Sequence, residues 1–435
     1  MERIISLFGI VVFVVIAFFL SSKRKEVRFN LILRALFFQF ALAVCLIGIP
    51  SLNVPGFLSF IFHAASNFFL AIIRFADEGA NFVAGPLVDP AKANGYIFAV
   101  KVLPVVVFFS SLMSVLYHYG IMQKIVGGFA KIMHKILPIS GAEALASSAN
   151  IFIGQTEAPL VIAPYVQKMT RSELNCLMVG GMATVAGGVL AAFVDMLSPF
   201  VKDIGGHLLT ASVLSAPAAI MYAKIMVPET EEHLSSKDVF NKDHNDEKKS
   251  NAIEAAAAGA STGMKMAINI VAMLIAFIAL VALLNGVLSY LGEFINFSNW
   301  GNTIIPDEIW SASKGKLSLE MILSILFLPF AFLLGIPFSE CAHIAGLLGE
   351  KVIINEFYAY IHLAQIGENL SEKSIIVASY ALCGFANFSS IGIQLGGIGE
   401  IAPNRRKDIA QLGIKALIGG SFAAFTTACI ANILL

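Results

Sequence analysis

Apolar runs that are long enough to cross a membrane make up most of the chain. Eight of them approach or exceed the roughly 17 residues that a helix needs to span a bilayer. They cover residues 4–20, 31–50, 96–118, 174–197, 207–227, 264–290, 374–403 and 409–435. The pattern predicts eight transmembrane helices. Polar residues at 184–188 and 385–390 predict that the fourth and seventh helices are broken.

Three further apolar segments are too charged or too short to be read as spans. Residues 57–83 and 121–137 carry charged side chains on an apolar helix, a pattern typical of helices lying in the membrane interface. A crossing helix at 319–334 would place the basic cluster at 405–407 outside, whereas a flat helix keeps it with the other basic loops. Because Lys and Arg gather on the cytoplasmic side, the flat position is favoured.

The stretch 147–167, SSANIFIGQTEAPLVIAPYVQ, is an apolar run with a polar cluster at its middle. A charge at membrane depth costs about 2.5–3.5 kcal/mol on insertion scales. Backbone broken by Gly and Pro is tolerated there only where protein or a water-filled cavity surrounds it. The stretch therefore predicts a re-entrant hairpin whose polar tip faces a binding cavity.

The second half of the chain repeats the order of parts in the first. Residues 128–159 can be laid over residues 329–360, and each segment leads to a tip with a carboxylate, Glu157 or Glu356. A broken span follows each tip. Interrupted segments at matching places in two halves indicate the binding site of a transporter. The halves enter the membrane from opposite sides, so we expect an inverted repeat and alternating access.

The repeat also predicts a division of the chain into functional parts. We expect residues 120–227 and 319–435 to form the two repeats of a transport domain. Residues 1–119 and 264–318 are expected to form a scaffold, and residues 228–263 a charged cytoplasmic linker. The positive-inside rule places both chain termini on the outer side.

Composition supports an integral membrane protein and excludes several other classes. The chain is 57% hydrophobic and 13% charged, whereas soluble domains carry about 25% charged residues. Its mean hydropathy is +0.81. The 29 basic and 29 acidic residues leave no basic excess for binding nucleic acid. The five cysteines have no paired metal-binding spacing, so no cofactor is expected beyond a coupling ion.

The two tips and the seventh span carry groups that suit a nucleoside. Gln155 offers a donor and an acceptor, and ionised Glu157 offers acceptors, which match the edge of a nucleobase. Glu356 can accept two vicinal hydroxyls of a sugar. The run 385–390 adds an amide, hydroxyls and rings that can stack on a flat base. The alternative is that these groups only satisfy one another between helices.

A second set of polar groups suits a cation. Asn150 offers an amide oxygen and Thr184 a hydroxyl, and both stand beside interrupted helices. Sodium takes oxygen ligands, including carbonyls freed by unwound backbone, at such breaks in transporters. The sequence therefore predicts a sodium site between the first tip and the fourth span.

Three motifs resemble the signatures of the concentrative nucleoside transporters: GQTEAP at 154–159, NEF at 355–357 and CGFANFSSIGIQLGG at 383–397. The resemblance extends over most of the chain. It implies an all-α integral membrane protein with eight transmembrane helices, two re-entrant hairpins, interfacial helices and an inverted repeat. It further implies an elevator-type transporter, a homotrimer, and a bacterial cytoplasmic (inner) membrane location.

The resemblance also implies roles for individual residues. The base side of the substrate site maps to Gln155, Thr156, Glu157 and Phe385, and the ribose side to Glu356, Asn387 and Ser390. The sodium site maps to the side chains of Asn150 and Thr184 and the backbone carbonyls of Ile153 and Val185. Thr184 stands where the family pattern has Ser, a change that keeps the hydroxyl.

We therefore expect cation-coupled uptake of nucleosides such as uridine, with sodium as the coupling ion. Some bacterial relatives use protons, so proton coupling is the first alternative. A remoter alternative is an intramembrane enzyme with Glu157 and Glu356 as acid and base. Nothing in the sequence resembles a nucleophile–base pair, so we expect a transporter. Preference between purines and pyrimidines depends on pocket size, which the sequence leaves open.

Overall fold

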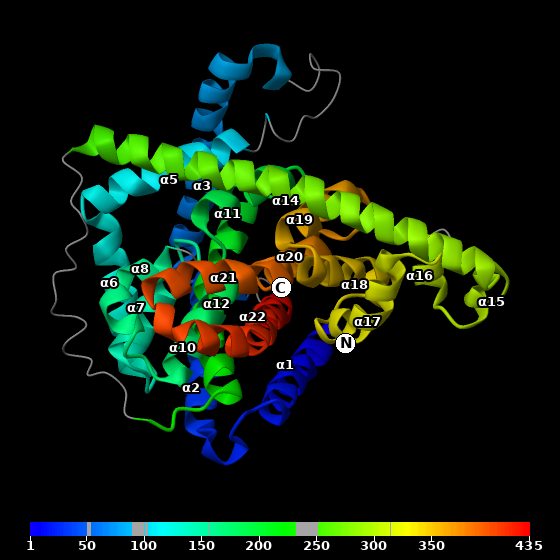
Figure 1. The fold of residues 1–435 in the computed structure, drawn as a ribbon, viewed down its shortest axis with the longest axis horizontal. Coiled ribbons are helices and arrows are strands. Elements are labelled where there is room, and N and C mark those ends of the chain that lie inside the picture. The colour runs from blue at the N-terminus through cyan, green and yellow to red at the C-terminus, as the bar shows by residue number, and fades with distance from the viewer. Residues whose placement is uncertain (50–53, 89–99, 101–102, 156, 232–250, 314) are drawn as a thin grey trace.

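The computed structural model describes residues 1–49, 54–88, 100, 103–155, 157–231, 251–313 and 315–435 (Figure 1). These residues are mainly helical, with one antiparallel strand pair, β1 (Gly48–Ile49) and β2 (Val54–Pro55). The longer helices are α1 (Glu2–Phe19), α2 (Phe29–Ile47), α3 (Ser59–Ala84), α5 (Leu103–His118), α6 (Ile121–Ile136), α10 (Arg171–Ala183), α11 (Gly187–Leu197), α12 (Ile204–Met226), α14 (Ala252–Phe294), α17 (Leu319–Leu333), α18 (Phe338–Ile353), α19 (Glu356–Ile366), α20 (Glu372–Leu382), α21 (Phe388–Ile401) and α22 (Arg406–Leu434). The predicted all-α membrane fold is confirmed.

Six of the predicted spans recur as helices long and apolar enough to cross a membrane: α1, α2, α10 with α11, α12, α14 and α22. The third span is described from Leu103 onward, as α5, and the seventh comprises α20 and α21. Helix α3, where an interfacial helix was predicted, is also long and apolar enough to cross a membrane. Its charged residues, Arg74, Asp77 and Glu78, lie in its second half, so its first half is interrupted only by uncharged polar residues and His63.

The predicted breaks in the fourth and seventh spans are confirmed. Residues 184–186 separate α10 from α11, and residues 383–387 separate α20 from α21. The repeat is visible in the helix starts. Thr170 and Ser371 cap α10 and α20, and Ala186 and Asn387 precede α11 and α21. Both pairs stand 201 positions apart, so the repeats match in length from hairpin to broken span.

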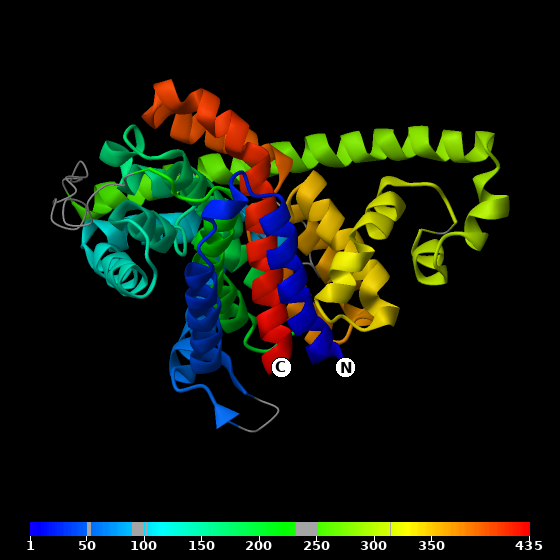
Figure 2. The ribbon, with the colours of Figure 1, turned by 90° about the horizontal axis from the view of Figure 1, so that it is seen from below.

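Two buried helices, α12 and α22, form the centre of the molecule, and α1 and α2 pack along them. Figure 2 shows α1 and α22 side by side with the two chain ends adjacent. The Arg3 guanidinium donates to the Leu435 carbonyl at 2.8 Å. Helix α14 instead runs along one side of the molecule and packs against α5. Contact is close at Gly259, where a Cβ would lie 2.6 Å from the Ser110 carbonyl oxygen.

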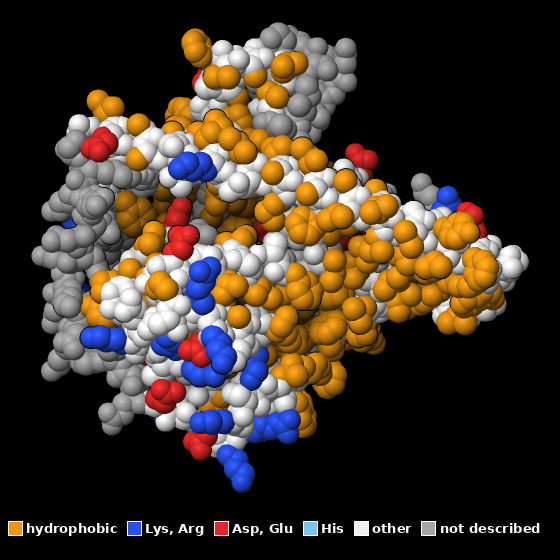
Figure 3. All heavy atoms as spheres, viewed as in Figure 1, with side chains coloured by type: hydrophobic (Ala, Val, Ile, Leu, Met, Phe, Trp, Pro, Cys, Tyr) orange, Lys and Arg blue, Asp and Glu red, His pale blue; other side chains and the backbone are white. Residues whose placement is uncertain are grey.

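The basic loops predicted to share one side of the membrane do lie together. Lys23 donates to the Thr230 hydroxyl at 3.0 Å, and Arg171 pairs with Asp408 at 3.7 Å. Figure 3 shows Lys and Arg side chains gathered over the region of α10 and α2, whereas hydrophobic side chains dominate the right side of the view. Because Asp408 lies in the first turn of α22, the basic cluster at 405–407 is on the same side as the first loop. This supports the flat position of α17, which turns by 119° into α18.

Candidate functional site

Two hairpins point their tips toward the broken helices. In the first, α7 (Gly141–Ala149) leads to the tip, and α8 (Ala158–Val161) and α9 (Ala163–Val166) return from it. Each returning helix has a proline in its first turn, where the missing N–H costs nothing. In the second hairpin α18 leads in and α19 leads out. Asn355 caps the N-terminus of α19, because its side-chain oxygen accepts a hydrogen bond from the Tyr358 N–H at 2.8 Å.

A chain of hydrogen bonds joins both tips through the seventh span. Gln394 Nε2 donates to Gln155 Oε1 at 3.0 Å, and Gln155 Nε2 donates to Ser390 Oγ at 2.9 Å. The Ser390 N–H donates to Asn387 Oδ1 at 2.8 Å, and Asn387 Nδ2 donates to Glu356 Oε2 at 2.8 Å. All five side chains are buried. Residues far apart in the sequence, on two hairpins and one broken helix, therefore meet at one place.

Helix ends fix the orientation of this network. Asn387 caps α21 with its oxygen and so must turn its amide N–H₂ toward Glu356. Glu356 is itself the first residue of α19. The N-terminal ends of α19 and α21 carry partial positive charge, which favours a carboxylate or other oxygen there. The arrangement presents one carboxylate and one fixed amide to any solute that enters between the tips.

Glycines let the two broken helices approach each other closely. Gly384 has φ +125°, and a Cβ there would lie 2.7 Å from the Met182 carbonyl oxygen. At Gly181 a Cβ would lie 2.8 Å from Gln155 Cβ and 2.9 Å from Gln394 Nε2. These contacts bring the breaks of both repeats against each other and against the first tip.

We predict that Gly384→Ala destabilises the protein by about 1–3 kcal/mol, because the residue would be strained at positive φ and would clash with Met182. Gly392→Ala is the matched control. It lies inside α21 with nothing within 4 Å of the added methyl group, so it should be neutral or slightly stabilising. Thermal unfolding of the purified variants measures both effects. Equal melting temperatures for the two variants would contradict the prediction.

Glu157 and Phe385, which were also predicted for the base side, lie near this network. Glu157 is half-buried at the start of α8, and its side chain makes no capping bond. Phe385 is half-buried in the break of the seventh span and packs against the main core. Thr156 lies outside the described residues. Glu157 and Phe385 are thus placed at the tip and the break, but they are not part of the hydrogen-bond chain described above.

The residues predicted for sodium gather at the C-terminal ends of α7 and α10. Asn150 is 1% exposed, and its Oδ1 and Nδ2 have no hydrogen-bond partner among the described residues. Thr184 follows α10 and donates its hydroxyl to the Gly180 carbonyl at 2.9 Å, which leaves its oxygen lone pairs free. Ile153 and Val185 are buried in non-helical backbone.

This donor set fits a small hard cation. A buried amide without a partner calls for an explanation, and a cation bound at Asn150 Oδ1 supplies one for the oxygen. The carbonyl ends of α7 and α10 add partial negative charge. Asn150 also lies against α10, because a Cβ at Gly180 would come within 3.0 Å of its Nδ2. Sodium held by Asn150, Thr184 and nearby carbonyls would therefore bridge the first hairpin and the fourth span.

Sequence reasoning missed two buried residues beside these sites. Gln394 lies in the motif of the seventh span, one helical turn beyond Ser390, and that spacing could have identified it. Its Nε2 also donates to the Met178 carbonyl at 2.9 Å. Lys351 is fully buried near the end of α18, and its ammonium donates to the Ala381 carbonyl at 2.9 Å. A lysine in an apolar hairpin was itself a signal, because a charge at that depth is expensive.

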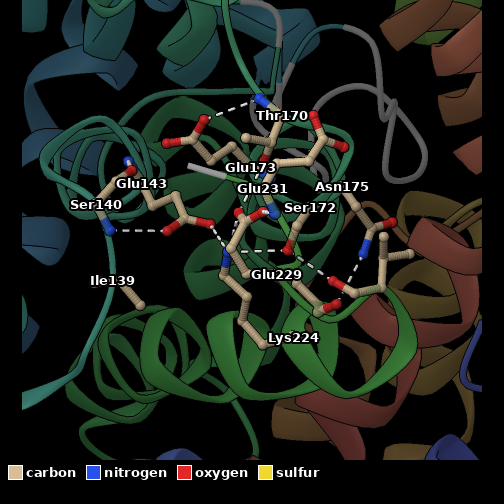
Figure 4. A network of polar contacts seen from close by, with 12 residues as sticks. Ile139, Ser140, Glu143, Thr170, Ser172, Glu173, Asn175, Lys224, Glu229 and Glu231 are labelled. Carbon is tan, nitrogen blue, oxygen red and sulfur yellow. Dashed lines mark hydrogen bonds and ion pairs between the residues drawn. The ribbon is translucent and has the colours of Figure 1, made fainter. Parts of the chain in front are cut away.

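A second buried cluster lies at the opposite ends of α7 and α10 (Figure 4). Lys224, 7% exposed, places its ammonium 2.5 Å from Glu143 Oε1, 3.0 Å from Ser172 Oγ and 3.3 Å from Glu229 Oε2. Glu229 also accepts from the Thr170 hydroxyl at 2.8 Å. Burial raises the pKa of Glu229, but Lys224 and the Thr170 bond together hold it below its ordinary value. The cluster fixes α7 and α10 to the end of α12.

Two re-entrant hairpins and two broken helices that meet around buried polar groups define a membrane transporter built as an inverted repeat. Residues 8–87 and 207–432 match the families described as Na+ dependent nucleoside transporter N-terminus and C-terminus, and residues 99–200 match the family described as Nucleoside recognition. The chain belongs to the concentrative nucleoside transporter family. The resemblance drawn from the three motifs is confirmed, and the protein is a transporter rather than an enzyme.

Curated relatives cover the whole chain. It is 41% identical to an uncharacterized transporter of Haemophilus influenzae, over 100% of this chain and 98% of that protein. It is 37% identical to Sodium/nucleoside cotransporter 1 of Mus musculus and 36% identical to Solute carrier family 28 member 3 of Homo sapiens. All of this chain aligns with each of these two mammalian proteins, and it spans 64% and 60% of their lengths.

The fold also matches solved structures of the transporter CNTnw. The inward-facing, substrate-bound state is 38% identical, with a TM-score of 0.87 over 100% of this chain and 98% of that chain. An outward-facing state of a CNTnw variant gives a TM-score of 0.88 at the same identity, over 100% of this chain and 99% of that chain. Identity and coverage at this level extend the family assignment from the motifs to the full length of the fold.

Proposed function

We propose that the protein takes up nucleosides such as uridine together with sodium, by alternating access. The observation that carries this proposal is the hydrogen-bond chain that joins the two hairpin tips through the seventh span. Polar groups so deep in an apolar protein are expensive, and in membrane transporters they mark the path of the solute. Membership of a sodium-dependent nucleoside transporter family supports the choice of solute and ion.

The substrate site that we propose has a base side and a ribose side. Gln155, Thr156, Glu157 and Phe385 form the first, and Glu356, Asn387 and Ser390 form the second. In the structure Gln155 bonds to Ser390 and Asn387 bonds to Glu356, so these groups satisfy one another without a solute. A nucleoside would exchange those bonds for its own polar groups. The binding free energy of the nucleoside is then the difference between its hydrogen bonds to these side chains and the bonds that the side chains make to one another. It depends on how well the base edge and the vicinal hydroxyls fit the side chains.

Sodium is proposed to act through the first tip. Bound between Asn150 and Thr184, with carbonyls of Ile153 and Val185, it would hold the tip against the fourth span. The Gly187 N–H already bonds the Phe152 carbonyl at 3.2 Å across this contact. An ordered tip presents Gln155 to the base, so sodium raises nucleoside affinity. By thermodynamic reciprocity the nucleoside raises sodium affinity by the same factor.

The movement that we propose is an elevator motion of the two repeats, residues 120–227 and 319–435, carrying α1 and α2 with them. The scaffold is then the rest of residues 1–119 together with residues 264–318. CNTnw and its variants occupy inward-facing, intermediate and outward-facing states in closely similar folds, which supports such a cycle. Within the scaffold α5 and α14 pack against each other. Helix α1 packs along α22 and α2 packs along α12, which favours assigning α1 and α2 to the moving part.

The assembly and orientation proposed here follow the family and the distribution of charge. We propose a homotrimer in a bacterial cytoplasmic (inner) membrane. The side that carries Lys23, Arg171 and the cluster at 405–407 would face the cytoplasm. Both termini, which lie at the other ends of α1 and α22, would then be outside. Residues 228–263 are proposed to connect the repeats on the cytoplasmic side, with α14 beginning at Ala252.

We predict that Asn150→Ala weakens sodium binding much more than it weakens nucleoside binding at saturating sodium. Loss of one oxygen ligand should raise the sodium concentration for half-maximal uridine binding by about tenfold, which corresponds to 1.4 kcal/mol. Sodium titration at fixed uridine measures the shift. Ser212→Ala, which removes a bond to the Ile151 carbonyl nearby, controls for loosening of the first hairpin. An unchanged sodium midpoint in Asn150→Ala would contradict the sodium assignment.

Uptake of radiolabelled uridine into proteoliposomes tests the proposed function. With an inward sodium gradient, uridine should accumulate above its external concentration, and it should not do so when choline replaces sodium. Accumulation driven by a proton gradient alone would favour the proton-coupled alternative. Equal flux under all gradients would exclude coupled transport.

A further inference from the structure

In each repeat, the C-terminal ends of a hairpin helix and a broken helix lie together, and the two repeats carry different side chains there. The offset of 201 positions that relates α10 to α20 places Gly180 opposite Ala381. Asn150 in the first hairpin and Lys351 in the second contact these two matched positions. Asn150 follows α7 directly, and Lys351 lies in the last turn of α18. Gly180 and Ala381 lie in the last turns of α10 and α20, just before the breaks.

The contacts in each repeat follow this correspondence. In the first repeat Asn150 lies against Gly180, and the Gly180 carbonyl accepts from the Thr184 hydroxyl. In the second, the Lys351 ammonium donates directly to the Ala381 carbonyl at 2.9 Å. Both positions are almost fully buried, with exposed fractions of 1% for Asn150 and 0% for Lys351.

The electrostatic surroundings of the two positions are also alike. In each repeat two helices end side by side, α7 with α10 and α18 with α20, and their carbonyl ends carry partial negative charge. Such paired ends attract a cation. In the first repeat Asn150 supplies a neutral amide with unpartnered polar atoms. In the second repeat the chain itself supplies a cation, and Lys351 also interacts electrostatically with Glu356 at the neighbouring tip.

We propose that the Lys351 ammonium is a built-in cation that occupies, in the second repeat, the place that sodium takes in the first. It holds the second hairpin against the seventh span permanently, and it keeps Glu356 positioned for the ribose. Only the first hairpin then needs an ion from solution, so the transporter couples one sodium ion to each nucleoside. This inference rests on the proposed sodium site at Asn150 and Thr184.

Reciprocal substitutions test the proposal in purified protein, with uridine affinity and sodium-induced thermal stabilisation as the two measurements. Asn150→Lys places an ammonium at the first position. It should bind uridine in choline with nearly the affinity that the unsubstituted protein shows in sodium, and it should lose its sodium-induced rise in melting temperature. Lys351→Asn removes the ammonium from the second position. Its uridine affinity at moderate sodium should fall at least about tenfold and recover at high sodium, with a steeper sodium dependence because two ions now bind.

Two control variants accompany these. Lys351→Arg keeps a cation and should bind uridine more tightly than Lys351→Asn. Lys373→Asn removes a partly exposed lysine that pairs with Glu2, and it should leave both measurements unchanged. If Lys351→Asn does not fold, Asn150→Lys alone decides: uridine binding that still requires sodium would overturn the proposal.

The sodium dependence of the unsubstituted protein distinguishes a failure of the role proposed for Lys351 from a failure of sodium coupling. Absence of any sodium effect on stability and uridine binding would refute sodium coupling itself. A clear sodium effect, combined with a Lys351→Asn variant that has normal uridine affinity and unchanged sodium dependence, would refute only the role assigned to Lys351. A ratio of two sodium ions to one uridine in the unsubstituted protein would also contradict it.

Discussion

Glu356→Gln is expected to lower uridine affinity by about 100-fold while the protein keeps its fold. The carboxylate is proposed to accept the two ribose hydroxyls, and a hydrogen bond to a charged group contributes about 1.5–3 kcal/mol. Gln retains a single acceptor and no charge, so roughly 2.8 kcal/mol is lost, at 1.4 kcal/mol for each tenfold. Calorimetric titration of uridine into purified protein in sodium measures the change.

The control for this variant is Glu372→Gln, which removes an exposed carboxylate from the first turn of α20. It should leave uridine affinity unchanged. Asn387→Ala should also lose uridine binding, because its amide both caps α21 and contacts Glu356. Normal affinity in Glu356→Gln would refute the ribose assignment. The sodium-induced rise in melting temperature should survive in Glu356→Gln, since the proposed sodium site lies in the other repeat.

Lys224→Met should destabilise the protein by about 3–5 kcal/mol, because it leaves buried carboxylates without their cation. Glu143, 2.5 Å from the ammonium, would lose its ion pair while still bonding the Ser140 N–H at 2.9 Å. Adding Glu143→Gln to Lys224→Met should recover part of the loss, since the second change removes the uncompensated charge and keeps an acceptor for Ser140. Thermal unfolding of the single and double variants gives the coupling.

Lys415→Met is the matched control, because this half-buried lysine of α22 lies on the same basic side but makes no ion pair with Glu143, Glu173 or Glu229 in the structure. Its melting temperature should change little. If the double variant is less stable than Lys224→Met, the ion pair is not what holds the cluster, and its carboxylates are stabilised in another way.

The sequence predicted best those parts of the fold that local chemistry determines. Breaks in the fourth and seventh spans follow from Gly and polar residues inside apolar runs, and the first hairpin follows from prolines beyond a polar tip. These signals act over a few residues, so no tertiary information is needed. The positive-inside rule placed the basic loops together for a similar reason: the bilayer sorts charge regardless of how the helices pack.

The sequence grouped the two tips with the seventh span, but it could not predict individual contacts between distant segments. The Lys224 cluster joins Glu143, Thr170 and Glu229, and nothing in the sequence pairs that lysine with those partners. The role of Gln394 depends on its hydrogen bond to Gln155 of the other repeat, at 3.0 Å, which the sequence does not indicate. The charges of helix α3 gather in its second half, so its length and apolar character suit a spanning helix as well as the predicted interfacial one.

A structure of the protein with sodium and uridine bound tests the central claim most directly. The account predicts uridine between the two hairpin tips, with its base against Gln155 and its ribose hydroxyls at Glu356 and Asn387, replacing the hydrogen bonds that now join these side chains. It also predicts an ion between Asn150 and Thr184. Uridine bound elsewhere, with the bonds from Gln155 to Ser390 and from Asn387 to Glu356 intact, would contradict it.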